Sequence, residues 1–286
     1  MNISNVPVLR KLEYRYGPYL FGNTLGFAIN RTWKNFVSDC KKVYPIKNRV
    51  VTGTPAARLQ DQGLAVIGKT NVDELASHVE AYFGTENKVY AAMNSAEALK
   101  LAPQVFNVIQ SVQLEVEAFF GSHFQPYWIS IQKTAPGPTS TASSFGWHID
   151  DNPKEMIKLF VYLNDVSESN GAFRAFPWKV TKKLLKDGFR SNSETVRMAN
   201  HEKINKFLEA NPKSLLVLEG PKGTVLGFDN NLVHKGTAPR EGYRLAIQIP
   251  VIPSMTPITL EQVEKALQSP GKRDYPTNPY INDFGS

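Results

Sequence analysis

FGWHIDDNPKEMIKLFVYLNDV, residues 145–166, is the segment around which the rest of the chain is organised. It places His148 and Asp150 two residues apart at the end of one predicted strand. The chain then turns through Asn152–Pro153 and enters a second strand that carries Lys158. Residues two apart on a strand point to the same face, so His148 and Asp150 can reach one ion. A His-x-Asp pair alone fits many metal sites, and a third ligand has to come from elsewhere.

A second stretch, GTVLGFDNNLVHKGTAPREGYRLAIQI at residues 223–249, supplies that ligand. It contains His234 and, ten residues later, Arg244. Two imidazoles and one carboxylate occupy one face of an octahedron and leave three adjacent positions open, an arrangement suited to non-haem Fe(II). Structural zinc sites usually recruit cysteines, and Cys40 is the single cysteine of the chain. We therefore predict His148, Asp150 and His234 as metal ligands and catalytic residues.

Arg244 adds specificity to this site. It begins the predicted strand RLAIQI, which we expect to run antiparallel to the strand ending at His234, with the guanidinium facing inward. Burying a guanidinium without a carboxylate partner is costly, and a dicarboxylic co-substrate would supply the partner. The alternative is an ordinary surface arginine on an edge strand.

The remaining pattern predicts helices first and strands afterwards. Capping pairs predict helix starts at Asn71 (with Glu74), at Asn94 (with Glu97) and at Thr259 (with Gln262). The second helix is interrupted at Pro103, is expected to resume from Gln104 and ends at Gly121. At least seven short strands follow, beginning with residues 127–134. This order favours an α+β fold built around a β-sandwich.

No repeat or linker divides the chain, so we expect one domain over residues 1–286. It would comprise an N-terminal extension (1–62), a core (63–253) and a C-terminal helix and tail (254–286). The core carries a basic insertion at 179–214, which holds nine Lys or Arg against four acids and accounts for most of the net charge of +7.

Charge and composition indicate which partners and which cellular compartment to expect. The positive charge favours an anionic substrate, with the basic insertion as its lid, and the alternative is a solvated basic surface. With no secretory leader pattern and a single cysteine, we expect a cytoplasmic protein. Residues 1–50 mix basic and aromatic side chains, which can stack on bases or touch a membrane peripherally. We expect them instead to wrap the outside of the core.

The motifs GWHIDD, KLFVYLNDV, NGAFRAF and GTVLGFDNNLVHKGTAP-x3-YR together resemble the Fe(II)/2-oxoglutarate-dependent oxygenases, and among them the phytanoyl-CoA dioxygenase-like branch. The resemblance covers residues 63–253. It implies a double-stranded β-helix (a jelly roll, cupin-like) with helices packed on one face. It also implies Fe(II), 2-oxoglutarate and O2, with ascorbate as an optional reductant, and hydroxylation with release of succinate and CO2. His148, Asp150 and His234 would hold the iron, and Arg244 would bind the distal carboxylate of 2-oxoglutarate.

The chain departs from the family pattern at two places. After the Asn-Gly turn the family usually reads towards Pro-Gly-Ser-His, whereas this chain continues with Pro177–Val180 into the basic insertion. The small hydroxylated residue often found two positions after the distal histidine is Gly236 here. The second contact to the co-substrate is therefore open, with these candidates: Thr237, Gln132, Tyr127 and Lys158. Lys158 can equally be a solvated strand residue.

Two other functions stay open at this stage. One is a cupin-like metal-binding protein without catalysis or without oxidative chemistry. The other is an oxygenase that acts on nucleic acid or protein. Our first choice remains an anionic small molecule, or a lipid- or sugar-linked substrate, rather than nucleic acid. The sequence predicts neither the substrate itself nor an oligomeric state.

Overall fold

The computed structural model describes residues 27–45, 50–86, 88–139, 144–150, 155–189 and 194–268. The basic aromatic segment before residue 27, Asp151, the expected turn at Asn152–Pro153 and the C-terminal tail lie outside the described residues.

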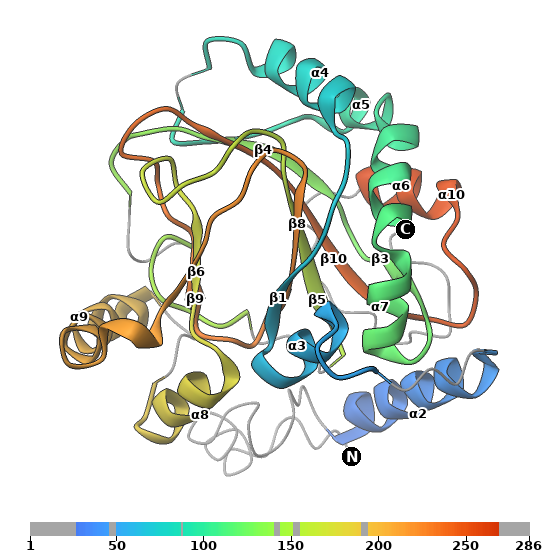
Figure 1. Ribbon diagram of the computed structural model, residues 1–286, viewed down its shortest axis with the longest axis horizontal. Coiled ribbons are helices and arrows are strands. Elements are labelled where there is room, and N and C mark those ends of the chain that lie inside the picture. The colour runs from blue at the N-terminus through green and yellow to red at the C-terminus, as the bar shows by residue number, and fades with distance from the viewer. Residues whose placement is uncertain are drawn as a thin grey trace.

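Two antiparallel sheets form the core (Figure 1). The larger has the order β1 (Leu64–Lys69), β8 (Thr224–Asp229), β5 (Ile157–Tyr162), β10 (Arg244–Ser254), β4 (Ser130–Thr134) and β2 (Tyr90–Ala92), and β3 (His123–Pro126) also pairs with β10. The smaller has the order β7 (Leu216–Leu218), β6 (Phe173–Ala175) and β9 (His234–Lys235). His148 extends the smaller sheet through an antiparallel bridge to His234.

The path of the chain between the sheets makes this core a jelly roll. From β4 the chain passes to His148 in the small sheet, to β5 in the large sheet and to β6 in the small one. After β7 it alternates again, through β8, β9 and β10. The large sheet thus reads β4-β10-β5-β8 across its centre, and the small sheet reads His148-β9-β6-β7. This order of two facing sheets is the double-stranded β-helix that the resemblance implies, and the predicted fold class is confirmed.

Strand alternation divides the apolar residues into an interior and an exterior set. On β5, Phe160 and Tyr162 pack with Phe173 and Leu226 between the two sheets. Their neighbours on the strand point the other way, into the layer of helices that covers the large sheet. These outward residues are Ile157, Leu159 and Val161. β5 is buried on both faces, which explains its continuous apolar run.

Helices cover the outer face of the large sheet (Figure 1): α3 (Pro55–Gln62), α4 (Asp73–Phe83), α5 (Ser95–Leu99), α6 (Ala102–Ser111), α7 (Gln113–Phe120) and α10 (Leu260–Leu267). α2 (Phe27–Val43) packs at the end of β10, where Trp33, Phe36 and Cys40 meet Ile252. Among the described residues, no helix is both long enough and apolar enough to cross a membrane.

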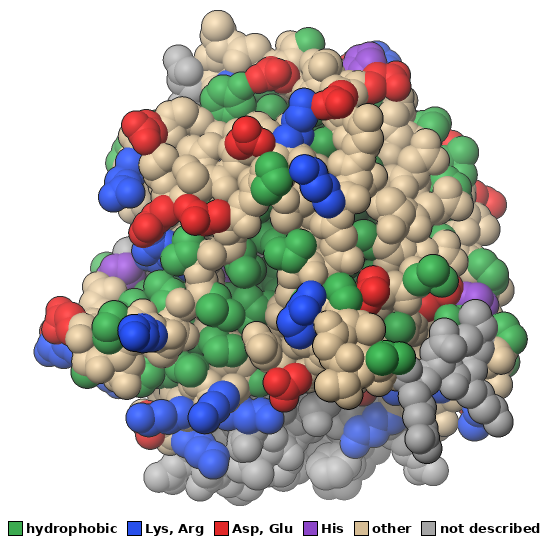
Figure 2. All heavy atoms as spheres, viewed as in Figure 1, with side chains coloured by type: hydrophobic (Ala, Val, Ile, Leu, Met, Phe, Trp, Pro, Cys, Tyr) green, Lys and Arg blue, Asp and Glu red, His purple; other side chains and the backbone are tan. Residues whose placement is uncertain are grey.

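The basic insertion forms a second helical layer. It contains α8 (Trp178–Lys186), α9 (Glu194–Ala210) and a short 3-10 turn (Pro212–Ser214). Leu184, Leu185 and Ile204 pack on outward-facing residues of the small sheet. The four lysines of α8 are exposed (Lys179, Lys182, Lys183 and Lys186), and blue side chains gather over this helix at the lower left of Figure 2. The described part of the insertion therefore packs on the outer face of the small sheet, while Trp178 at the start of α8 packs against the cluster between the two sheets. A function as a lid stays a prediction.

Several predicted boundaries shift. Asn94 caps its helix through Glu97 N, and Thr259 forms the predicted capping box with Gln262. Asn71 is not a cap, because the helix begins at Asp73 and the Asn71 side chain accepts from Asp73 N in a turn. The predicted interruption near Pro103 is confirmed: α5 ends at Leu99 and α6 begins at Ala102, with Pro103 in its first turn. A second break, which was not predicted, falls at Val112 between α6 and α7.

One glycine is required by close packing, and this gives a matched stability test. Gly223 has φ +88°, and an added Cβ would lie 2.1 Å from the Thr70 carbonyl oxygen. Gly53 has the same φ, but nothing lies within 4 Å of its added Cβ. We expect Gly53→Ala to cost only about 1–2 kcal/mol for the left-handed conformation. Gly223→Ala should cost clearly more, because backbone must also move. Urea unfolding of both variants measures the difference, and equal losses would contradict the packing explanation.

Candidate metal centre

His148 and His234 are fixed next to each other by main-chain hydrogen bonds. The His148 N–H donates to the His234 carbonyl and the His234 N–H donates to the His148 carbonyl, both at 2.9 Å. Asp150 N donates to the Asn230 carbonyl at 2.9 Å, which ties the second half of the His-x-Asp motif to the turn after β8. The three predicted ligands come from two segments that lie far apart in the sequence, and the jelly roll brings these segments together.

The three side chains form a compact group. The Oδ1 atom of Asp150 lies 3.4 Å from Nε2 of His148 and 3.8 Å from Nε2 of His234. One potential ligand atom from each residue lies within 4.8 Å of the other two. Nδ1 of His148 lies 2.8 Å from the Gly146 carbonyl, and Nδ1 of His234 lies 2.8 Å from the Leu232 carbonyl. These carbonyls fix the proton on Nδ1, so the Nε2 lone pair of each ring is free to bind a metal.

The local electrostatics favour the protonation states that bind metals. Burial, helped by His148, lowers the pKa of His234 to about 3, so the imidazole is neutral at pH 7. Burial by itself would raise the pKa of Asp150, but Lys158 and the two histidines together hold it well below its usual value. A neutral imidazole and an ionised carboxylate are the forms that coordinate metals. Within the described ranges, His148, Asp150 and His234 are the group of side chains suited to iron.

Apolar residues behind the small sheet hold the ligands in place. Trp147 and Val233 each precede a histidine of the group and therefore point to the opposite face. They pack there with Phe176, whose ring centroid lies 4.9 Å from that of Trp147. Trp147 therefore supports the histidines from behind the small sheet.

Arg244 lies on the interior face of β10 and is 5 % exposed. Its guanidinium donates to the Gly171 carbonyl and, at 3.3 Å, to Thr134 Oγ1, and it lies 5.3 Å from the centroid of the Phe160 ring. Its Nε atom is buried, and no described residue accepts a hydrogen bond from it. Burial lowers the pKa of Arg244, but a guanidinium stays charged in proteins. Among the described residues, no Asp or Glu pairs with it.

The predicted inward orientation of Arg244 agrees with the structure, whereas the predicted strand partner is wrong. β10 pairs with β4, β5 and β3 in the large sheet, and the His234 strand pairs with β6 in the small sheet. Arg244 therefore reaches the interior from the sheet opposite His234.

Two of the four candidate contacts to a co-substrate carry unpaired buried atoms. Gln132, on β4, lies opposite Ala246 on β10, and its Oε1 has no hydrogen-bond partner among the described residues. Thr237 Oγ1 is likewise buried and unpaired. Because the interior would otherwise leave the Arg244 charge uncompensated, a small anionic ligand fits beside it. The Thr237 hydroxyl can donate to such a ligand, and Gln132 can donate through Nε2 but not through Oε1.

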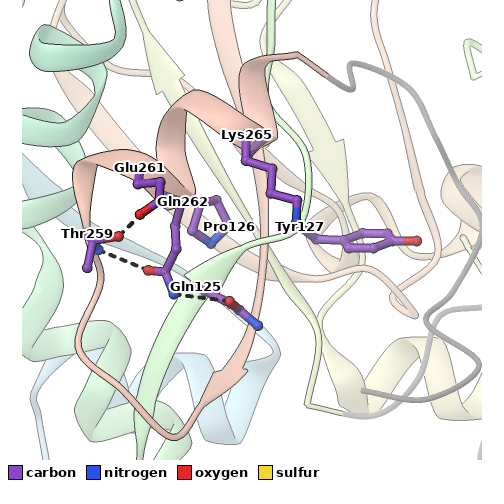
Figure 3. Close-up of a pocket in the computed structure, with 8 residues that line it drawn as sticks. Gln125, Pro126, Tyr127, Thr259, Glu261, Gln262 and Lys265 are labelled. Atoms are coloured by element: carbon purple, nitrogen blue, oxygen red, sulfur yellow. Dashed lines mark hydrogen bonds between the residues drawn. The ribbon is translucent and has the colours of Figure 1, made fainter. Parts of the chain in front are cut away.

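The other two candidates have different surroundings. Lys158 is neither a solvated strand residue nor a free cation: it is buried, and its Nζ donates to Asp150 Oδ2 at 2.8 Å. Tyr127 packs with Trp33 and Ile252 at the end of β10. It borders a pocket of about 220 Å³ under α10, and its ring points away from the other labelled residues (Figure 3).

Asn230 is a residue of this site that sequence reasoning did not single out. Its side chain is fully buried, and neither Oδ1 nor Nδ2 has a hydrogen-bond partner among the described residues. Its carbonyl accepts the hydrogen bond from Asp150 N. The sequence does contain a pattern that points to Asn230: it and Asn231 form a polar pair within an otherwise apolar run, shortly before His234.

No protein-family model and no curated protein matches the chain. Its structure is similar to several solved ones. SnoN from nogalamycin biosynthesis, an epimerase solved with Fe3+ and alpha ketoglutarate, is 14 % identical over 69 % of this chain and 82 % of its own, with a TM-score of 0.48. EctD from S. alaskensis, solved with 2-oxoglutarate and 5-hydroxyectoine, is 13 % identical over 72 % of this chain and 79 % of its own, with a TM-score of 0.47.

AviO1 from Streptomyces viridochromogenes Tue57 is 17 % identical over 71 % of this chain and 96 % of its own, with a TM-score of 0.45. Fe was also bound in another structure of EctD. The phytanoyl-CoA dioxygenase-like branch stays a prediction. Because these likenesses are distant, the fold assignment rests on the strand order, and the interpretation of the site rests on its own residues.

Proposed function

We propose that the protein is an Fe(II)- and 2-oxoglutarate-dependent dioxygenase that hydroxylates an anionic substrate. The observation that carries the proposal is a buried arginine without an acidic partner among the described residues, inside the same jelly roll as a His-Asp-His group. In such an enzyme Asp150 would be a metal ligand and Arg244 would bind the co-substrate. A non-catalytic cupin-like protein needs neither the open coordination face nor the arginine.

The residues divide the work as follows. His148, Asp150 and His234 would hold the iron through Nε2, one carboxylate oxygen and Nε2. Arg244 would bind the distal carboxylate of 2-oxoglutarate, whose charge compensates the guanidinium. Gln132 and Thr237 would provide further polar contacts. Iron and 2-oxoglutarate, when bound, supply the activation of O2. In the overall reaction one oxygen atom enters the substrate C–H bond as hydroxyl and the other enters succinate, with loss of CO2.

The substrate is proposed to be an anionic small molecule or a lipid- or sugar-linked anion. The net charge of +7 and the four exposed lysines of α8 support this choice. Peripheral membrane contact remains part of the proposal only for a lipid-linked substrate. An oxygenase acting on nucleic acid would instead require binding to oligonucleotides that weakens steeply with salt.

The test is succinate release from the iron-loaded protein across a panel of anionic metabolites, with His148→Ala as the blank. We expect slow 2-oxoglutarate turnover by the wild type alone and a clear stimulation by the true substrate class. Turnover indistinguishable from the blank throughout the panel, in protein shown to contain iron, would contradict the proposed reaction and favour a metal-binding protein without oxidative chemistry.

A further inference from the structure

The two oxygens of the Asp150 carboxylate have different partners. Oδ1 faces the two histidine Nε2 atoms, at 3.4 and 3.8 Å. Oδ2 accepts a hydrogen bond from Lys158 Nζ at 2.8 Å. One oxygen is thus directed towards the metal-binding group, and the other is already bound by a cation.

Lys158 is held in this position by the sheet. It lies opposite Pro250 on β10 and Phe228 on β8, and it shares the interior face of β5 with Phe160. Its ammonium lies 5.5 Å from the Phe228 ring centroid and 6.0 Å from that of Trp128. Only 9 % of the residue is exposed. Few other conformations can keep its charge paired, because Asp150 is the one acid that pairs with Lys158 among the described residues.

We propose that Lys158 is a positioning residue that restricts Asp150 to binding the metal through a single oxygen. This inference rests on the proposed function. A carboxylate free at both oxygens can chelate a metal and occupy two coordination positions. By holding Oδ2, the lysine leaves Oδ1 as the one available ligand atom and keeps three positions of the octahedron open. A chelating 2-oxo acid and O2 together need all three of these positions.

The charge of Lys158 also assigns it a role different from that of Arg244. Arg244 has no acidic partner among the described residues, so its charge is available to a ligand. Lys158 has its charge compensated by Asp150, so it is not the anchor of an anionic co-substrate. The two buried cations therefore predict separable defects: loss of Arg244 removes a ligand contact, whereas loss of Lys158 changes how the metal is coordinated.

The experiment counts water molecules on bound Mn2+, using water-proton relaxation of the intact protein with Mn2+ alone. We expect the wild type to retain about three coordinated waters, since the protein supplies three ligand atoms to an octahedral ion. In Lys158→Met the side chain can still pack on Phe228 and Trp128, but Oδ2 is released. We expect about two waters, so relaxation enhancement per bound ion falls by about one third. Lys158→Arg retains a cation and should keep the wild-type value.

A second readout uses the Mn2+-loaded proteins with 2-oxoglutarate and no turnover. Lys158→Met should bind 2-oxoglutarate about 10- to 100-fold more weakly, the range seen when a partner of a metal ligand is lost, and Lys158→Arg should restore most of that affinity. An unchanged water count and affinity in Lys158→Met would overturn the inference and leave the proposed function standing. A wild-type protein that binds no Mn2+ or Fe(II) would overturn the proposed function and this inference together.

Discussion

Replacing His234 with alanine is expected to abolish succinate release and metal binding. The imidazole contributes one of three ligand atoms, and the remaining two residues would have to hold the ion alone. Loss of an outer partner of a metal ligand already costs about 10- to 100-fold, so loss of a ligand should cost more than about 100-fold in metal affinity. Metal titration followed by tryptophan fluorescence, together with a succinate assay, measures both effects.

Thermal unfolding gives an independent reading of the same variant. At a metal concentration of 100 times Kd, the wild type should gain about 2.7 kcal/mol of stability from binding. His234→Ala should gain less than about 0.4 kcal/mol at that concentration. The control is His78→Ala, since His78 is exposed on α4 and its Nδ1 contacts the Glu74 carbonyl, within the same helix. The account would be contradicted if His234→Ala kept both its turnover and its metal-induced stabilisation.

Replacing Arg244 with methionine is expected to weaken 2-oxoglutarate binding and leave metal binding intact. Truncating one partner of a buried charge pair costs about 2–5 kcal/mol, which is roughly 30-fold to several thousand-fold in affinity. Arg244→Lys should recover only part of this loss, because an ammonium lacks the planar fork that grips a carboxylate. Isothermal titration of the Mn2+-loaded variants with 2-oxoglutarate measures the affinities.

The same substitution should affect the ligand-free protein in the opposite direction. Without a ligand, the Arg244 charge is buried, and the described part of the chain offers it two hydrogen-bond acceptors, the Gly171 carbonyl and Thr134 Oγ1. Replacing it with an apolar side chain of similar length removes the desolvation cost. We therefore expect the free energy of unfolding of ligand-free Arg244→Met to equal or exceed that of the wild type.

Arg240→Met is the matched control for this pair of effects. Arg240 is exposed four residues earlier, on the same connection into β10. It should change neither the affinity for 2-oxoglutarate nor the stability by more than about 0.5 kcal/mol. A loss of affinity in Arg240→Met equal to that in Arg244→Met would show that general positive charge, rather than a directed guanidinium, binds the co-substrate.

The site was largely predictable because its information is local. Side chains two residues apart on a strand point to the same face whatever the fold, and the side chains of His148 and Asp150 do lie side by side. The inward orientation of Arg244 followed from the cost of its burial and the need for a partner. Both arguments use only short-range geometry and the chemistry of single side chains.

Other features depended on long-range pairing and could not be predicted in this way. The burial of Lys158 and the hydrogen bond from its Nζ to Asp150 Oδ2 depend on how β5 packs beside Asp150, which the sequence does not specify. Tyr127 was expected in the strand 127–134, but β10 is long enough to pair with β3 and β4 over successive stretches, at 251–254 and 244–248. The chain leaves the ladder between those two strands, and Tyr127 lies at the break.

The helical insertion shows a different limit. Its charge was visible in the sequence and suggested a lid over an anionic substrate. Its apolar residues, Leu184, Leu185 and Ile204, determine where it docks, and their partner surface was the outer face of the small sheet. Trp147 and Val233, which each precede a histidine ligand, form part of that surface because their side chains point to the outer face of the small sheet. The alternation rule gives this result once the strands are known.

The most direct test of the central claim is an anaerobic visible spectrum of the iron-loaded protein with 2-oxoglutarate. If the three open positions of the metal accept the 2-oxo acid as a chelate, a weak metal-to-ligand charge-transfer band should appear on its addition. The band should be absent from His148→Ala, and in Arg244→Met it should require a much higher concentration of 2-oxoglutarate. A wild-type sample that contains stoichiometric iron and shows no band at saturating 2-oxoglutarate would contradict the assignment of this site.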